Sequence, residues 1–149
     1  MNKQRVYDNL VEDEGVVHAI YRDHLGYPTF GVGHLITKDD PEYGMSIGTP
    51  VSEERVYSAF MQDLDTAIDE CYALYGQRDF DNLPTEVQEI LVNMMFNMGR
   101  TRLSKFKKMN AALEKNDWQT AAREGRDSRW YVQVTNRAER LMTRLENVS

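Results

Sequence analysis

Apolar residues in the first third of the chain follow two different periods. Val6 and Leu10 lie four residues apart, which predicts a short N-terminal helix with one apolar face. Residues 18–23 and 28–33 instead alternate between apolar and polar side chains, and the glycine-containing segment 24–27 separates them. The chain is therefore expected to pass from a helix into a β-hairpin.

A long amphipathic helix is expected after the hairpin. Residues 34–37 should extend the sheet, and two prolines and two glycines within residues 39–50 predict a loop. Ser52, which two glutamates follow, is a typical N-cap residue, and Gly76 marks the expected end of the helix. Apolar residues three or four positions apart lie between them: Val56, Phe60, Leu64, Ala67, Ile68, Cys71 and Tyr75.

Helical periodicity continues through the rest of the chain. A second helix should begin near Pro84, and its apolar face contains a row of methionines that we interpret as core rather than as a cofactor pocket. Residues 103–113 predict a further helix or a broken pair, residues 118–123 a short helix, and residues 135–145 the last one. The expected fold class is α+β, mainly helical, with a small N-terminal sheet.

Composition limits the functional class. A chain of 149 residues, 41% hydrophobic and 28% charged, is typical of one soluble domain. No apolar run reaches the length of a membrane span, and the N-terminus lacks the apolar centre of a signal peptide, so we expect neither a membrane anchor nor self-export. The single cysteine, Cys71, excludes an internal disulfide and lies on an apolar helical face, where a core role is expected.

Charge is unevenly distributed along the chain. Residues 1–99 contain 6 Lys and Arg against 18 Asp and Glu, whereas residues 100–149 contain 12 against 6. A basic second half would suit an anionic polymer such as peptidoglycan, and it would also suit nucleic acid. A solvated helical surface without a partner explains the same pattern.

Residues 14–34 concentrate the side chains that could perform chemistry. Glu14 and Asp23 are nine positions apart, and Thr29 adds a hydroxyl. Gly15 is expected to end the first helix in the left-handed conformation, which leaves Glu14 on its last turn and facing outward. The hairpin could then set Asp23 and Thr29 across a groove from Glu14. Two carboxylates in one groove suit glycoside hydrolysis, although an acidic chain also places two carboxylates this close by chance.

The string EGVVHAIYRDHLGYPTFGVGH at residues 14–34 resembles the phage-type lysozymes, a family of muramidases. The resemblance continues with QDLDTA at 62–67, NMMFNMG at 93–99 and SRWYVQVTNRAER at 128–140, and so covers most of the chain in order. It implies a lysozyme-like fold. It also implies that Glu14 is the general acid, that Asp23 is the second catalytic carboxylate, and that Thr29 helps to hold the attacking water.

Further roles follow only from this resemblance. Leu35 and Phe96 are expected to contact substrate. His34 and Asp63 are expected to form a buried ion pair. No metal or other cofactor is expected.

The resemblance also implies how the second half supports the site. Arg137 is expected to reach Glu14 across the floor of the cleft, and Trp130 to pack beneath it. The residues themselves equally allow Trp130 a plain core role.

We expect a single lysozyme domain over residues 1–149 that consists of two lobes. Residues 14–55 would form the small β lobe and residues 52–75 the connecting helix. Residues 1–13 and 76–149 would form the helical lobe. By resemblance, a final helix of larger family members is expected to be absent.

The activity implied is hydrolysis of the β-1,4 bond between N-acetylmuramic acid and N-acetylglucosamine in bacterial peptidoglycan, which would lyse the host cell and release phage. We expect inversion, because a hydroxyl at Thr29, across the hairpin from Asp23, can hold a water on the far face of the sugar. We expect a monomer that is made in the host cytoplasm, does not bind nucleic acid, and reaches the wall through a holin-type pore.

Two alternatives belong to other functional classes. Imidazole and carboxylate are zinc ligands, so His18, Asp23, His24 and His34 could form a metal site, although their spacing matches no known pattern. The chain could instead be a non-enzymatic binder of the cell wall or of nucleic acid through its basic second half. Such a binder would not need Glu14, Asp23 and Thr29 together.

Overall fold

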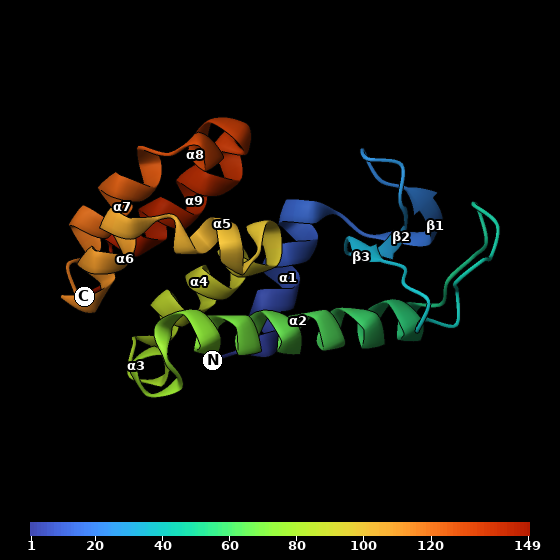
Figure 1. Ribbon diagram of the computed structural model, residues 1–149, viewed down its shortest axis with the longest axis horizontal. Coiled ribbons are helices and arrows are strands. Elements are labelled where there is room, and N and C mark those ends of the chain that lie inside the picture. Colours follow the sequence, from blue (N-terminus) through green and yellow to red (C-terminus); the bar gives the residue numbers. More distant parts are fainter. The chain divides into compact units, whose positions relative to one another are not determined.

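The computed structural model describes residues 1–149 (Figure 1). A small antiparallel sheet lies near the N-terminus, and helices account for most of the remaining chain, which confirms the α+β class. Contacts between residues divide the chain into two compact units, 3–66 and 67–149, the second of which includes residues 1–2.

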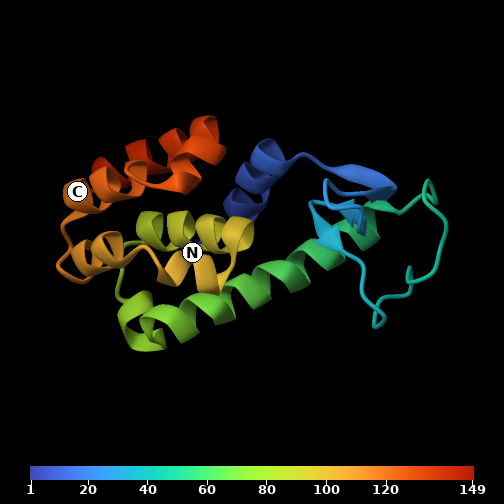
Figure 2. The same cartoon turned by 45° about the horizontal axis from the view of Figure 1, so that its top comes forward.

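The first unit consists of a helix, three strands and most of a long helix. Its elements are α1 (Lys3–Glu14), β1 (Val17–Arg22), β2 (Pro28–Gly31), β3 (His34–Leu35) and the N-terminal part of α2 (Glu53–Tyr75). Residues 3–13 thus lie in the same unit as the sheet, whereas we had grouped residues 1–13 with the helical lobe. Aromatic packing joins α1 to α2 within this unit, because the Tyr7 ring centre lies 4.7 Å from that of Phe60 and 5.2 Å from that of Tyr57. In Figure 2, α1 is the dark blue helix and α2 is the long green one.

The sheet has the order β1-β2-β3, and both strand pairs are antiparallel. The hairpin is therefore confirmed, but its register differs from the expected one, in which Asp23 lies across from Thr29. Asp23 N–H donates to the Tyr27 carbonyl at 2.9 Å, so these two residues close the turn. Counting back from that pair places Tyr21 across from Thr29.

One apolar cluster supports the hairpin from inside the first unit. It joins the sheet to the following segment and to the first turns of α2, and its buried members are Ile20, Phe30, Ile36, Val51, Val56 and Ala59. The expected loop at residues 39–50 contains neither helix nor strand, apart from a single bridge between Pro50 and Ala19.

The ends and the apolar stripe of α2 match the sequence prediction. Ser52 Oγ accepts the Arg55 N–H at 3.1 Å as an N-cap, and the helix ends immediately before Gly76. The apolar stripe is buried as far as Cys71. Burial raises the pKa of the Cys71 thiol to about 12, which keeps it protonated and makes it a core residue rather than a nucleophile.

The second unit is entirely helical. Its elements are α3 (Gln77–Asp81), α4 (Thr85–Met98), α5 (Arg100–Ser104), α6 (Lys107–Glu114), α7 (Trp118–Arg126), α8 (Arg129–Gln133) and α9 (Thr135–Glu146). The broken pair expected over residues 103–113 corresponds to α5 and α6. The sequence prediction missed α3 and α8, because a helix of five residues is too short to show a period.

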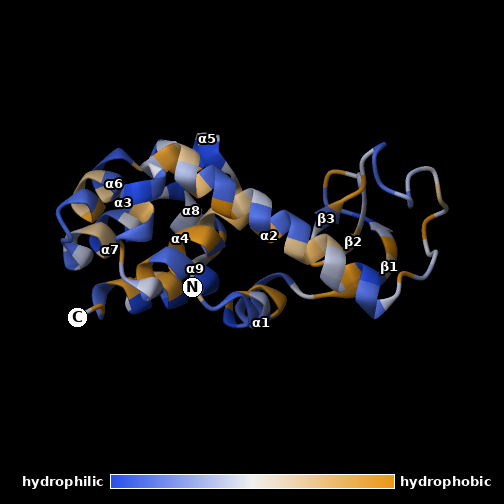
Figure 3. Ribbon diagram, turned by 90° about the horizontal axis from the view of Figure 1, so that it is seen from below, coloured by the Kyte–Doolittle hydropathy of each residue, from blue (hydrophilic) through white to orange (hydrophobic).

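Helix α4 is the buried centre of this unit. Glu89, Val92 and Asn93 are buried, and so are the six residues of its apolar face: Val87, Ile90, Leu91, Met94, Met95 and Met98. Figure 3 shows the hydrophobic colouring concentrated on this helix. The methionine row is therefore part of the core.

An arginine joins α7 to α9. Arg126 Nε donates to Glu139 at 3.0 Å, and its Nη1 donates to Glu146 at 2.8 Å. The Arg126 guanidinium, and then the Tyr131 hydroxyl, lower the pKa of Glu139 to about 2. Because this carboxylate accepts hydrogen bonds in its charged form, the contact depends on pH.

We expect Glu139→Gln to lower the melting temperature at pH 6. Because the pKa of Glu139 is lower in the folded protein than in the unfolded chain, its charged form stabilises the fold at pH values above the unfolded-state pKa of about 4.3. This contribution is lost as the pH falls through the folded-state pKa. The difference between variant and wild type should therefore shrink between about pH 4.5 and pH 2. Glu114→Gln, which changes an exposed glutamate of α6, is the control. A difference that stays constant with pH would contradict the prediction.

Candidate active site

Glu14 is the last residue of α1, as the sequence predicts. Gly15 has φ +76, and its N–H donates to the Val11 carbonyl at 2.8 Å, so the helix closes there. The Glu14 residue is exposed at this end.

The carboxylate of Glu14 lies close to the backbone of the turn between β2 and β3. A Cβ atom added to Gly33 would lie only 2.9 Å from Glu14 Oε2, which is too close for a side chain. Gly33 also has φ +68, a conformation that other residues adopt with strain. Gly33 therefore makes room for the Glu14 carboxylate.

Asp23 and Thr29 are connected through the backbone N–H and carbonyl of Tyr27. Asp23 Oδ1 accepts the N–H groups of Tyr27 and Leu25, both at 2.9 Å. The Thr29 hydroxyl donates to the Tyr27 carbonyl at 2.9 Å, and Thr29 is only 3% exposed. One oxygen of Asp23 is thus fixed, while Oδ2 makes no hydrogen bond in the structure.

Tyr21 is a residue of this region that the sequence analysis missed. It lies across from Thr29, and directly opposed residues of an antiparallel pair project from the same face of the sheet. Burial, then the charges of Glu14 and Asp23, raise the pKa of Tyr21. Both carboxylates therefore act on one hydroxyl. The alternating pattern of residues 18–23 could have identified Tyr21, because it places residues 21 and 23 on the same face of the expected strand.

His34 is held between two carboxylates. Its Nδ1 lies 2.7 Å from Asp63 Oδ2, and its Nε2 lies 3.0 Å from Asp40 Oδ2. Hydrogen bonding to Asp63 is the largest cause that raises the pKa of His34; burial opposes it, and Asp40 adds to it. With an acceptor on each side, both ring nitrogens can carry hydrogen in the imidazolium form.

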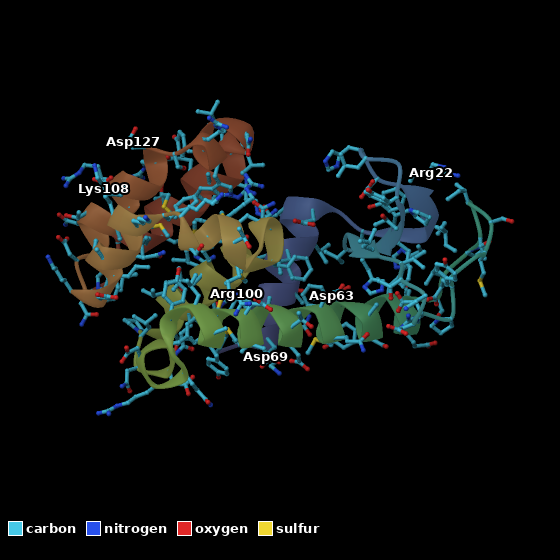
Figure 4. All side chains as sticks on the ribbon, viewed as in Figure 1. Arg22, Asp63, Asp69, Arg100, Lys108 and Asp127 are labelled. Atoms are coloured by element: carbon cyan, nitrogen blue, oxygen red, sulfur yellow. The ribbon has the colours of Figure 1, made fainter.

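The expected His34–Asp63 contact is present, but it is not the buried pair that we expected. Figure 4 labels Asp63 on α2. Its side chain is 31% exposed, and the better buried partner of His34 is Asp40, at 11%. Sequence analysis missed Asp40 because it lies in a loop without periodicity. Burial opposes a low pKa for Asp40, but the Thr37 N–H and His34 together lower it.

Arg55 extends this network along α2. Its Nε donates to Glu42 at 2.8 Å, its Nη2 donates to Asp40 at 3.2 Å, and its guanidinium lies 5.4 Å from the centre of the Phe30 ring. Residues 40–42 are thereby fixed to α2.

A hollow of about 510 Å³ lies beside this network, and Leu35 contributes to its wall. Leu35 is 48% exposed, and its role as a substrate contact stays a prediction. Phe96, on α4 of the other unit, is half-buried. Its role as a substrate contact stays a prediction.

Arg137 and Trp130 make well-defined contacts within the helical unit. The buried Arg137 donates from Nε and Nη2 to Asn93 Oδ1, at 3.0 and 2.8 Å. The Trp130 indole N–H donates to Asn97 Oδ1 at 2.8 Å, and its ring is buried. Core packing therefore accounts for Trp130. The expected contact between Arg137 and Glu14 stays a prediction.

The alternative of a metal site requires its ligands to gather. No three His, Cys, Asp or Glu side chains are arranged so that they could hold a metal ion, so the structure does not bring together His18, Asp23, His24 and His34. None of the helices has both the length and the hydropathy that crossing a membrane requires.

We expect Asp63→Asn to destabilise the fold by about 1–2 kcal/mol at pH 6, because the charged His34 loses the negative charge of its partner and keeps only a neutral amide oxygen as acceptor. Because the pKa of His34 is higher in the folded protein than in the unfolded chain, its charged form contributes its full stabilisation at pH values below the unfolded-state pKa of about 6.5. This contribution is lost as the pH rises through the folded-state pKa. Chemical unfolding should therefore show a difference that shrinks toward pH 9. Asp39→Asn, in the wall of the same hollow, is the control and should show no such trend.

We expect Gly33→Ala to abolish most hydrolytic activity and to cost about 1–2 kcal/mol in stability, since the methyl group displaces Glu14 and the backbone is strained. Gly44→Ala separates the two effects. Gly44 has φ +83 and open space around the position of a Cβ, so this variant should lose similar stability and keep its activity. Equal activity of the two variants would show that Gly33 does not position Glu14.

Comparison with known proteins supports the resemblance. The sequence model of the phage lysozyme family matches residues 11–147. The probable T4-type lysozyme 2 of Dictyostelium discoideum is 31% identical over 156 residues, which cover 93% of this chain and 92% of that protein.

Two phage proteins are also similar but are much longer. The pre-baseplate central spike protein Gp5 of Enterobacteria phage T4 is 31% identical over 149 residues, which cover 89% of this chain and 26% of that protein. The peptidoglycan hydrolase gp36 of Pseudomonas phage phiKMV is 28% identical over 148 residues, which cover 97% of this chain and 16% of that protein. Taken together with the full-length match to the lysozyme, these similarities show that the chain belongs to the phage lysozyme family.

Proposed function

We propose that this chain is a muramidase that hydrolyses the β-1,4 bond between N-acetylmuramic acid and N-acetylglucosamine in bacterial peptidoglycan. The observation that carries the proposal is geometric: Glu14 Oε2 lies against Gly33 in the turn between β2 and β3, while the backbone of the β1–β2 turn holds Asp23 and connects it to Thr29. The raised pKa of Tyr21, to which both carboxylates contribute after burial, agrees with this arrangement. Glycosidases typically use such a pair of carboxyl groups as their catalytic residues. Membership of the lysozyme family and similarity to a peptidoglycan hydrolase support it.

Glu14 is the proposed general acid. It lies at the exposed end of α1, where a polymer can reach it, and Gly33 leaves space for its carboxyl group. Its proton passes to the glycosidic oxygen as the bond from that oxygen to the anomeric carbon breaks. Proton transfer of this kind typically contributes about 10²–10⁴-fold to the rate.

Asp23 is the proposed general base. Two backbone N–H groups hold its Oδ1, so Oδ2 remains to accept a proton from water. The hydroxyl hydrogen of Thr29 is committed to the Tyr27 carbonyl, so the oxygen of that hydroxyl can accept the second hydrogen of the same water. Because Thr29 is nearly covered, a water held there would be enclosed and ordered.

This arrangement favours inversion. The oxygen of the held water attacks the anomeric carbon as the glycosidic bond breaks on the opposite face, and Asp23 takes the proton that the water loses. An inverting pair needs a carboxyl separation of about 6.5–9.5 Å to admit the water. We therefore expect the carboxyl groups of Glu14 and Asp23 to be about 6.5–9.5 Å apart.

In the phage life cycle, the proposed result is lysis of the host and release of progeny. The enzyme would be made in the host cytoplasm, pass a holin-type pore and meet its only partner, peptidoglycan, as a monomer without a cofactor.

We expect Glu14→Gln to fold normally and to clear permeabilised bacteria at about one hundredth of the wild-type rate or less, because the proton donor is lost. Glu12→Gln, two residues earlier on α1 and also exposed, should retain activity. Adding a chelator should leave wild-type clearing unchanged. Retention of more than about a hundredth of the activity by Glu14→Gln would reject the role of general acid.

We expect the first-formed reducing end to be the α-anomer when a β-linked substrate is cleaved. Proton NMR of the product, recorded before mutarotation, measures this directly. Initial β product, or a sugar ester trapped on Asp23, would overturn inversion and leave the muramidase assignment in place.

A further inference from the structure

A hollow of about 530 Å³ lies within residues 67–149, where the end of α2 meets α3 and α6. Figure 1 shows α3 and α6 at the same end of this unit. The volume is typical of small-molecule sites, which measure about 300–1,000 Å³. Glu14, Asp23 and Thr29 belong to the other unit and do not line the hollow, so the proposed hydrolysis leaves it without a role.

Part of the lining is apolar and is fixed by the fold. Leu113 of α6 is buried, and Leu74 and Leu83 are half-buried. The Tyr75 hydroxyl donates to Asn110 Oδ1 at 2.9 Å, which ties the end of α2 to α6. The hollow therefore presents apolar surface between helices that are already joined.

Four polar side chains of the lining have no partner. They are Asp79 of α3, Asn82 after α3, Glu114 of α6 and Asn116 after α6, and all four are exposed. None of these side chains forms a hydrogen bond or an ion pair, whereas Glu139 of the same unit is bonded to an arginine. Their oxygen atoms are therefore available to a ligand.

The charge of the hollow favours a cation. Two carboxylates and no basic side chain line it, so its formal charge is −2. Arg78 and Lys115 are next to Asp79 and Glu114 in the sequence, but they do not line the hollow and form no ion pair with these carboxylates. Two like charges at one hollow repel each other, and a bound cation would remove this cost.

The apolar lining distinguishes between kinds of cation. A calcium or magnesium ion requires several oxygen ligands at about 2.0–2.6 Å, and no three acidic or imidazole side chains gather to supply them. A primary ammonium group on an unbranched aliphatic stem suits both parts of the lining. The ammonium group has three N–H donors for carboxylate and amide oxygens, while the stem covers apolar surface.

We propose that this hollow binds a primary ammonium group carried on an aliphatic stem, with the ammonium group at Asp79 and Glu114 and the stem against the leucines. A free diamine and the side chain of a diamino acid within a peptide both present this chemistry. Binding is weak, because exposed ion pairs contribute little each.

The test is a titration of the full chain with Nα-acetyl-lysine amide, followed by the NMR shifts of backbone amides. Saturable shifts are expected at residues 74–83 and 110–116, and they should weaken with added salt. Nα-acetyl-norleucine amide has the same stem without the ammonium group, and methylammonium has the ammonium group without the stem. Each should bind more weakly than the lysine derivative.

Two results of this titration would overturn the proposal. The first is equal binding of the lysine and norleucine derivatives, which would show that the ammonium group is not recognised. The second is the absence of saturable shifts up to about 10 mM lysine derivative, ten times a Kd of about 1 mM.

The double variant Asp79→Asn/Glu114→Gln should weaken binding by about 2–30-fold, as expected for two exposed ion pairs. Glu12→Gln/Asp69→Asn removes the same charge from exposed positions that do not line the hollow, and it should bind like wild type. Thermal melts show whether both variants are folded, and the norleucine comparison decides if the first is not. Equal affinities of the two folded variants would contradict the proposal.

Cadaverine, a free diamine, identifies the source of the ammonium group. Tighter binding of the lysine derivative supports a peptide, and tighter binding of cadaverine supports a free diamine. Tighter binding of N-acetylglucosamine or of calcium ions at the same residues would instead reveal a sugar or metal site and overturn the proposal. A Glu14→Gln chain should bind the lysine derivative like wild type, so this site is tested even if the proposed hydrolysis fails.

Discussion

The backbone of Tyr27 determines the geometry of the candidate site. Its N–H donates to the carboxylate of Asp23, and its carbonyl accepts both the Asp23 N–H and the Thr29 hydroxyl. The two peptide groups that flank this one residue therefore fix the acid, the hydroxyl and the register of the hairpin. A shift of one residue would turn Tyr21 and Thr29 to the other face of the sheet.

Polar contacts add to the apolar packing of the unit that contains residues 3–66. Six buried residues form the apolar cluster under its sheet, and the loop at 39–50 contributes no regular structure. The chain of contacts from Asp63 through His34 and Asp40 to Arg55 joins β3, this loop and α2. Such a network rigidifies a structure when every member has its partner.

Sequence patterns predicted the elements that are long enough to show a period, and the sites whose residues lie close together along the chain. The two ends of α2, its apolar stripe and the closing of α1 before Gly15 all match. The register of the hairpin was wrong because periodicity does not indicate which residues close a turn. Asp40 was missed because its contact with His34 depends on how an aperiodic loop folds back.

The burial of Cys71 gives the molecule an internal reporter of its own opening. The thiol is inaccessible and its pKa is raised to about 12, so a thiol reagent can react only when the C-terminal part of α2 separates from its surroundings. Since this is the only cysteine in the chain, the rate of labelling would measure how often that single helix segment becomes exposed.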